Sequence, residues 1–163
     1  MSPTYPQTLP SLSQRDAITD ALYRAAIGSD HHDAALFNSA WAGEDVSMEL
    51  HDDKIRVLEG LAMIRTHVLD KVGPMDTTHN ISMVRVNHQD GANTAILSAT
   101  SMAQHAPAGT GRDPNGTKYT VGGEYSVDLI RDDGDGLWKM KKLVLNVVWS
   151  TGDPSLMGGP PKK

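Results

Sequence analysis

Residues 73–88 read GPMDTTHNISMVRVNH, and the hydrophobic pattern of the chain changes within this stretch. Up to Gly73 apolar residues recur at helical spacing, whereas from Thr77 onward apolar and β-branched residues follow a period of two. Gly73 and Pro74 are the residue types that end helices. The sequence therefore predicts helices in the N-terminal half of the chain and strands in the C-terminal half.

The segment upstream of this change favours three helices and one short strand. Ser13 is expected to cap the first helix, whose apolar residues recur as far as Gly28. A second helix is expected over residues 34–41 and a third over residues 55–72. Residues 46–50 alternate in polarity and predict a strand.

Downstream of the change, four long segments rich in β-branched and apolar residues predict strands. They span residues 77–88, 93–106, 117–131 and 137–150, and turn signals containing Gly or Pro separate them. Helices followed by hairpin-linked strands indicate an α+β fold, with the helices on one face of a curved, mostly antiparallel sheet.

The chain of 163 residues is expected to form one domain over residues 13–153. Residues 1–12 contain three prolines and predict an extended arm, and residues 154–163 predict a flexible tail. The start of the chain lacks the pattern of a signal peptide, and no apolar stretch approaches the length of a membrane span. A cytoplasmic protein with no membrane partner is expected.

Composition excludes several classes of function. The net charge is -5 and no run of Lys or Arg suggests a nucleic-acid partner. The absence of cysteine removes disulfides, thiolate nucleophiles and iron–sulfur clusters. His31-His32 and His51-Asp52-Asp53 lack the spacing of a known metal site, and the glycines at 134–136 open a strand rather than a helix. No metal and no cofactor are therefore expected.

Several short motifs follow one another from residue 15 to residue 153. They include Ala21-Leu-Tyr-Arg24, Asp30-x-x-Asp33, Gly73-Pro-x-Asp-Thr-Thr-His79, Ala103-Gln-His105, Gly122-Gly-x-Tyr125 and Trp149-Ser-Thr-Gly-Asp153. Their order and spacing resemble the SnoaL-like branch of the nuclear transport factor 2-like superfamily, which includes scytalone dehydratase, polyketide cyclases and fungal cofactor-free isomerases. The resemblance implies a cone of helices wrapped by a strongly bent sheet, a ligand pocket inside the cone, and a homodimer formed through the outer face of the sheet.

His79 is the first candidate for catalysis, because an imidazole takes and returns a proton near neutral pH without extreme tuning. Its place at the entry to a strand, after a Gly-Pro turn, resembles that of the pocket histidine of the dehydratases. Asp30 ends the first helix, where a carboxylate opposes the helix dipole, and the dehydratases place a carboxylate there beside the histidine. The alternatives are that His79 caps a strand and that Asp30, like Asp33, caps the second helix.

Glu124, Ser126 and Asp128 share one face of a predicted strand. Comparison with scytalone dehydratase implies that this face lines the pocket, with Glu124 as a second acid or base and Ser126 and Asp128 as substrate-binding groups. A solvent-facing polar stripe is the alternative.

A set of large apolar residues is expected to line the same pocket or to form ordinary core. It comprises Met48, Met83, Leu145, Val147 and Trp149, the last three from one predicted face of the final strand. Aromatic residues make up 5% of the chain, which also has 8 methionines, and this balance suits a roomy cavity for a bulky ligand. His105 is expected either at the pocket mouth, as a substrate-binding residue, or on the surface.

The sequence also departs from scytalone dehydratase. The second pocket histidine of that enzyme corresponds to Ala99 here, and its paired tyrosines correspond to Ser29 and about Leu50. The favoured function is therefore a cofactor-independent isomerase, dehydratase or cyclase acting on a hydrophobic oxygenated molecule of secondary metabolism. A non-catalytic ligand-binding or dimerising module of the same fold is the alternative, and it predicts that His79 and Asp30 do not face each other.

Overall fold

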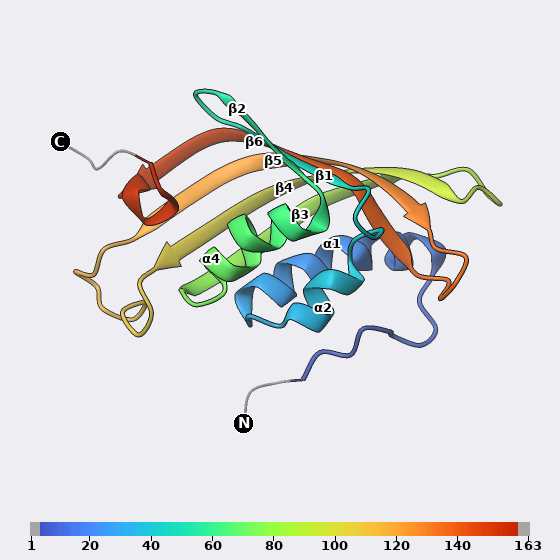
Figure 1. Cartoon of the computed structure of the whole chain (residues 1–163), viewed down its shortest axis with the longest axis horizontal. Helices are drawn as coiled ribbons and strands as arrows, with labels where there is room; N and C mark the ends of the chain where they lie inside the picture. The colour runs from blue at the N-terminus through green and yellow to red at the C-terminus, as the bar shows by residue number, and fades with distance from the viewer. Residues whose placement is uncertain (1–3, 160–163) are drawn as a thin grey trace.

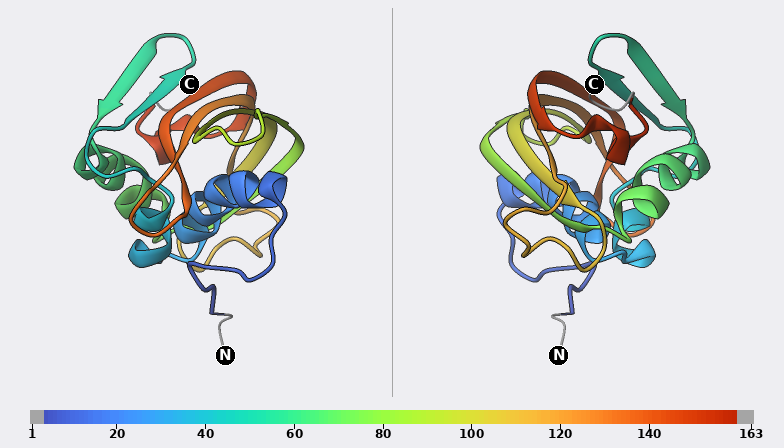
Figure 2. Two further views of the ribbon diagram at one scale, coloured as in Figure 1. Left: turned by 90° about the vertical axis from the view of Figure 1, so that its right-hand side faces the viewer. Right: turned by 90° about the vertical axis from the view of Figure 1, so that its left-hand side faces the viewer.

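Figure 1 shows the computed structural model, in which helices lie beneath one arched sheet. The structure describes residues 4–159. Residues 1–3 of the predicted arm and residues 160–163 of the predicted tail lie outside the described residues. The predicted α+β class is confirmed, and Figure 2 shows the sheet curving around the helices so that they occupy its concave side.

The first two helices begin where side-chain caps are available. Helix α1 (Gln14–Asp30) follows Ser13, whose side chain accepts a hydrogen bond from the Asp16 N–H, as predicted. Helix α2 (Ala34–Ser39) follows Asp33, whose side chain accepts from the Leu36 N–H. Gly28 does not end α1. A Cβ at Gly28 would lie 2.6 Å from the Phe37 nitrogen, so this glycine allows α2 to approach α1.

The third helical segment is shorter than predicted. It comprises α3 (Leu61–Ile64), a turn of π-helix η1 (Arg65–Leu69) and α4 (Asp70–Val72). The prediction of helix over residues 55–60 was wrong, because Ile55–Glu59 forms strand β2, which pairs with β1 (Ser47–His51). The Asp52 side chain accepts a hydrogen bond from the Lys54 N–H in the turn, and β-branched Ile55 and Val57 favour the extended backbone.

Four long strands complete the sheet, close to their predicted bounds. They are β3 (Asp76–Asn87), β4 (Thr94–Ala106), β5 (Tyr119–Arg131) and β6 (Trp138–Gly152). The strand order is β2-β1-β6-β5-β4-β3, and all neighbours are antiparallel except the parallel pair of β1 and β6. A short 3-10 helix, η2 (Pro154–Met157), follows β6. None of the helices within residues 4–159 has the length and apolar character needed to cross a lipid bilayer.

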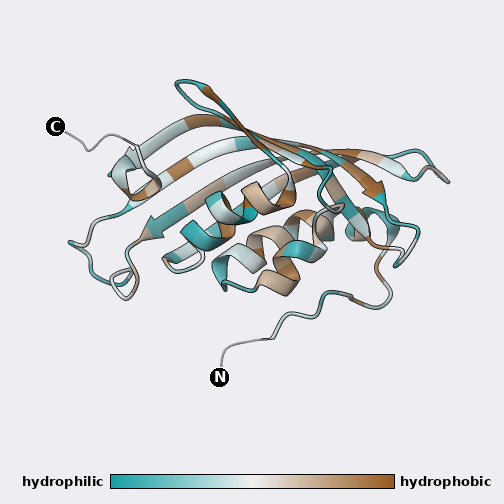
Figure 3. Cartoon of the chain, in the orientation of Figure 1, coloured by the Kyte–Doolittle hydropathy of each residue, from teal (hydrophilic) through white to brown (hydrophobic). Residues whose placement is uncertain are grey.

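Alternation along the strands separates a buried concave face from an exposed outer face, and Figure 3 shows the resulting bands of polar and apolar residues. In β4, Ala95, Leu97 and Ala99 face the helices and are buried, whereas Ile96 and Met102 are about half exposed. Val127 and Leu129 of β5 are buried on the same concave side. The apolar core therefore fills the space between α1 and the sheet.

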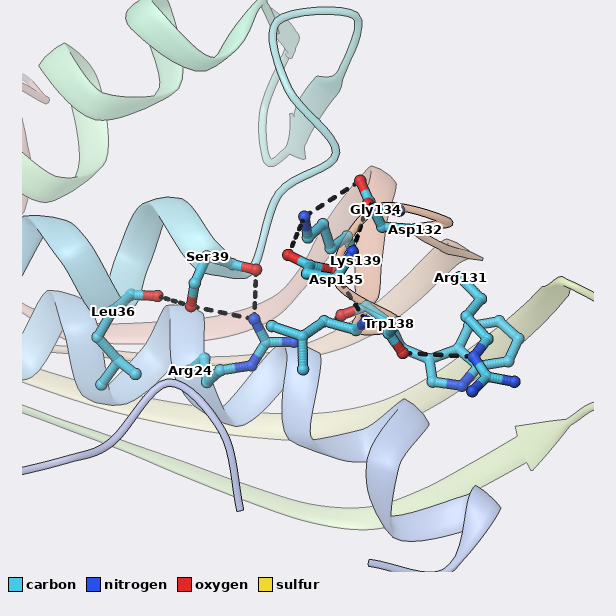
Figure 4. Close-up of polar contacts among 11 residues, drawn as sticks. Arg24, Leu36, Ser39, Arg131, Asp132, Gly134, Asp135, Trp138 and Lys139 are labelled. Carbon is cyan, nitrogen blue, oxygen red and sulfur yellow. Dashed lines mark hydrogen bonds and ion pairs between the residues drawn. The ribbon is translucent and has the colours of Figure 1, made fainter. Parts of the chain in front are cut away.

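Arg24 is a buried cation that joins three elements, as Figure 4 shows. Its Nε donates to the Asp20 carboxylate at 2.8 Å, its Nη1 donates to the Ser39 carbonyl and to the Ser39 hydroxyl at 3.0 Å, and its Nη2 donates to the Trp138 carbonyl at 2.5 Å. Burial lowers the pKa of Arg24, and the Asp20 carboxylate acts in the opposite direction. The interactions hold α1 against both α2 and the start of β6.

Met83 occupies a strained position on the outer face. It has a φ of 53° and is 80% exposed, at the point between Ser82 and Arg85 where the register of β3 against β4 shifts. A side chain in this left-handed region costs about 1–2 kcal/mol, which glycine avoids.

We expect Met83→Gly to leave stability unchanged or to raise it by roughly 0.5–1 kcal/mol, because release of strain offsets the greater entropy of glycine in the unfolded chain. Urea denaturation would measure this change. Val57→Gly is the matched control: it is half exposed in the regularly paired strand β2 and should lower stability by about 0.5–1 kcal/mol. Equal destabilisation by both variants would contradict the strain at Met83.

Candidate active site

The Asp30 carboxylate accepts two hydrogen bonds from one residue, His79. Asp30 Oδ2 is 2.8 Å from the His79 backbone nitrogen, and Asp30 Oδ1 is 2.6 Å from His79 Nδ1. Each side chain is 14% exposed. Asp30 is the last residue of α1, and His79 is an inward-facing residue near the start of β3. The structure therefore brings together the two residues that sequence reasoning placed first.

This geometry defines the state of the imidazole. A carboxylate at Nδ1 favours the tautomer that carries its proton on Nδ1, which leaves the lone pair of Nε2 available to accept another proton. The backbone N–H of His79 saturates the other carboxylate oxygen, so rotation of Asp30 is restrained as well. The pair is oriented for proton transfer at Nε2.

His105 lies beside this pair and is buried, not on the surface. It is 4% exposed, and its ring meets the His79 ring edge-on with centroids 5.6 Å apart. Its Nδ1 is 2.9 Å from the Thr77 hydroxyl. Burial, reinforced by the nearby His79 and opposed by Asp30, lowers the pKa of His105 to about 4. His105 is therefore a neutral imidazole at neutral pH.

Tyr125 is a site residue that sequence reasoning missed. It pairs with Ala99 of β4 and Leu145 of β6 on the concave side, and its hydroxyl is hydrogen bonded to the hydroxyl of Ser101. Burial raises the pKa of Tyr125, and the negative charge of Asp30 acts in the same direction. The apolar alternation with Val127 and Leu129 was the available signal that this face of β5 points inward.

The prediction that Glu124, Ser126 and Asp128 face the pocket was wrong. All three are exposed on the outer face, because Val127 and Leu129 between and beyond them fill the core. Met83, Glu124 and Ser126 instead line a groove of about 380 Å³ on the outer face. The prediction that Met83 lines the interior was also wrong, because its side chain is 80% exposed on the outer face of the sheet.

The apolar residues predicted to line the interior are divided between the two faces. Met48 and Leu145 pack against the concave core, and Val147 pairs with inward-facing Gly123. Trp149 does not join them, because a bulge opposite Gly122 and Gly123 inserts one residue and reverses the alternation. Its indole lies over Gly122 on the outer face, where a Cβ would approach it to 2.2 Å.

Solvent reaches the concave face at the end that holds His79. The inward-facing residues Thr77, Ile81, Val121 and Tyr125 are only partly buried there, whereas Leu97, Val127, Leu129 and Met140 at the other end are almost completely buried. The Asp30–His79 pair, in which each side chain is 14% exposed, thus lies at the more accessible end of a mostly apolar interior. Among residues 4–159, no group of three His, Asp or Glu side chains is arranged to hold a metal ion.

Comparisons with known proteins identify the family and the fold. The model of the SnoaL-like domain family matches residues 10–144. A relative from Penicillium crustosum, terrestric acid biosynthesis cluster protein E, is 39% identical over 158 residues, which cover 96% of this chain and 98% of the relative.

Two solved structures from Novosphingobium aromaticivorans share the fold. A candidate aromatic ring hydroxylase has a TM-score of 0.71 at 20% identity and covers 88% of this chain and 95% of its own. A candidate scytalone dehydratase has a TM-score of 0.66 at 17% identity, with coverage of 83% and 85%. At these identities the two structures establish the fold alone, whereas the family match spans most of the domain. The chain belongs to the SnoaL-like domain family.

Proposed function

We propose that this protein is a cytoplasmic, cofactor-independent acid–base enzyme, an isomerase, dehydratase or cyclase that acts on a hydrophobic oxygenated small molecule of secondary metabolism. The observation that carries this proposal is the Asp30–His79 pair, with its 2.6 Å contact at the accessible end of an apolar interior. The name of the Penicillium relative supports a role in secondary metabolism.

In the proposed mechanism, His79 Nε2 removes a proton from substrate carbon or oxygen. Asp30 stabilises the resulting imidazolium and keeps the ring in place, so the same nitrogen can return the proton to a second substrate atom. Proton transfer by a positioned histidine contributes on the order of 10²–10⁴ to a rate, and binding of the substrate beside His79 on the concave face supplies orientation. Isomerisation, dehydration and cyclisation of this kind involve no net oxidation or reduction of the substrate.

The alternative of a non-catalytic binding module receives less support. Such a module has no need to fix the tautomer of a partly accessible histidine, and it predicts that His79 and Asp30 are apart. Their two hydrogen bonds favour the enzyme. The candidate scytalone dehydratase among the structural neighbours is compatible with proton-transfer chemistry on this fold.

We expect His79→Ala to lower turnover by at least about 100-fold while the protein remains folded. The backbone N–H at position 79 still donates to Asp30 in this variant, so the carboxylate keeps one partner. The measurement is deuterium incorporation or product formation, by mass spectrometry, from a panel of hydrophobic ketones incubated in heavy water. Asp30→Asn should show a smaller loss, because the ring remains but its orientation and charge stabilisation weaken.

His67→Ala provides the matched control, since His67 is exposed on the π-helical turn and its Nδ1 is hydrogen bonded to the Met63 carbonyl of the same helical segment. It should retain full turnover. Undiminished exchange in the folded His79→Ala variant would refute the proposed mechanism.

His105 should make folding sensitive to acid. Its pKa is near 6.5 in the unfolded chain and about 4 in the folded protein, so below pH 6.5 protons bind preferentially to the unfolded state. Stability is therefore lost as the pH falls from about 6.5 toward 4. We expect His105→Gln to flatten this part of the stability profile by up to roughly 3 kcal/mol, measured by urea denaturation across the range.

His67→Gln serves as the control for the pH profile, because an exposed histidine should not change the slope. A slope as steep in His105→Gln as in the parent protein would contradict the role of His105 in the acid sensitivity.

We also propose that two copies associate through the outer face of the sheet. Ile96, Met102 and Trp149 expose large apolar side chains on this face. Met102→Glu should therefore convert a dimer into a monomer in light-scattering measurements. Met63→Glu is a matched control, because Met63 is equally exposed, at 46% against 45%, but lies on the third helical segment. A parent protein that is monomeric at high concentration would contradict this proposal.

A further inference from the structure

The hydroxyl groups of Tyr125 and Ser101 form a buried polar pair inside the apolar concave face. Ser101 is 5% exposed and Tyr125 is partly buried, and their hydroxyls bond to each other. A tyrosine hydroxyl in this setting holds its proton, so it is a hydrogen-bond donor at neutral pH. The two hydroxyls thus serve as hydrogen-bond partners for each other.

The register of the sheet places this pair next to the catalytic histidine. Ala103 pairs with His79, and Ser101 is the next inward-facing residue of β4, opposite Ile81. Two residues along a strand span about 7 Å. The two side chains that share these pairings with His79 and Ser101 are apolar: the methyl group of Ala103 and the side chain of Ile81. A short carbon skeleton can therefore reach His79 with one end and the hydroxyl pair with the other.

We propose that the Tyr125–Ser101 pair binds the carbonyl oxygen of the substrate, which makes the substrate an enolisable carbonyl compound such as an unsaturated or β-hydroxy ketone or lactone. This inference rests on the proposed function of His79. It assigns Tyr125 as a second catalytic residue, since its hydroxyl contacts the reacting oxygen.

The reaction then balances without an external reactant. His79 Nε2 takes the proton from the carbon next to the carbonyl, the C–H electron pair forms a carbon–carbon double bond, and the carbonyl π pair moves to oxygen. Tyr125 donates its O–H to the resulting enolate oxygen, where charge develops. When the carbonyl re-forms, the imidazolium returns its proton to another carbon, which gives an isomer, or to a β-hydroxyl, which leaves as water.

A phenolate tests this site because it resembles the enolate in charge and shape. We expect the protein to bind 4-nitrophenol as the yellow phenolate at a pH below the solution pKa of the probe, as followed by absorbance. Tyr125→Phe should weaken this binding by about 10- to 100-fold, because a hydrogen bond to a charged oxygen is lost. Tyr23→Phe, the same change at an exposed position on α1, should have no effect.

Two further variants keep the test decisive. Ser101→Ala removes the hydrogen-bond partner of Tyr125 but keeps the tyrosine, so it should weaken probe binding less than Tyr125→Phe does. If Tyr125→Phe does not fold, the weaker binding by Ser101→Ala still tests the site. His79→Ala retains the hydroxyl pair and should still bind the probe, which separates this inference from the proposed role of His79. Unchanged affinity in folded Tyr125→Phe, or no phenolate binding by the parent protein, would overturn the assignment.

Discussion

The pair of hydrogen bonds that the Asp30 carboxylate accepts from His79 is the constraint on which the concave site depends. It connects the last residue of α1 to an early residue of β3, and it uses both oxygens of one carboxylate. Arg24 acts further back on the same helix, where it bonds to Ser39 and Trp138. With both ends of its C-terminal half restrained, α1 cannot slide along the sheet, and the position of His79 Nε2 is set by the scaffold rather than by a loop.

Buried polarity in this fold is concentrated on a few neighbouring inward positions. His105, Ser101 and Tyr125 occupy places where aliphatic side chains would stabilise the core more, and the buried imidazole of His105 lowers stability in acid. The opposite end of the same face, with Leu97 and Val127, carries only apolar groups. Such an uneven distribution is typical of a domain that gives up some folding free energy at a functional site.

The sequence predicted most of the fold because the change of period at Gly73 is strong. It indicated Asp30 because a carboxylate at a helix C-terminus opposes the helix dipole, and His79 because of its imidazole chemistry; for both, the resemblance to the dehydratases supplied the rest. It did not predict which face of a strand points inward where bulges intervene. Trp149 was placed inside by simple alternation, which the bulge at Gly122 and Gly123 reverses. Glu124 was placed inside by the comparison with scytalone dehydratase, but Val127 and Leu129 on the opposite face of β5 fill the core. Tyr125 was overlooked for the same reason. The short β2 strand was read as helix, since β-branched residues in a brief segment fit either pattern.

The central place of β6 has a consequence for biosynthesis. This strand is the last long one to leave the ribosome, yet it lies between β1 and β5, and Ser47 pairs with Lys142 across most of the chain. Until it emerges, the β1–β2 hairpin has no neighbour in the sheet and α1 has only part of its apolar partner surface. Closure of so long a loop is slow. The apolar concave side of the earlier strands therefore stays exposed until β6 has been synthesised. Chaperone binding is expected to prevent aggregation mainly in that interval.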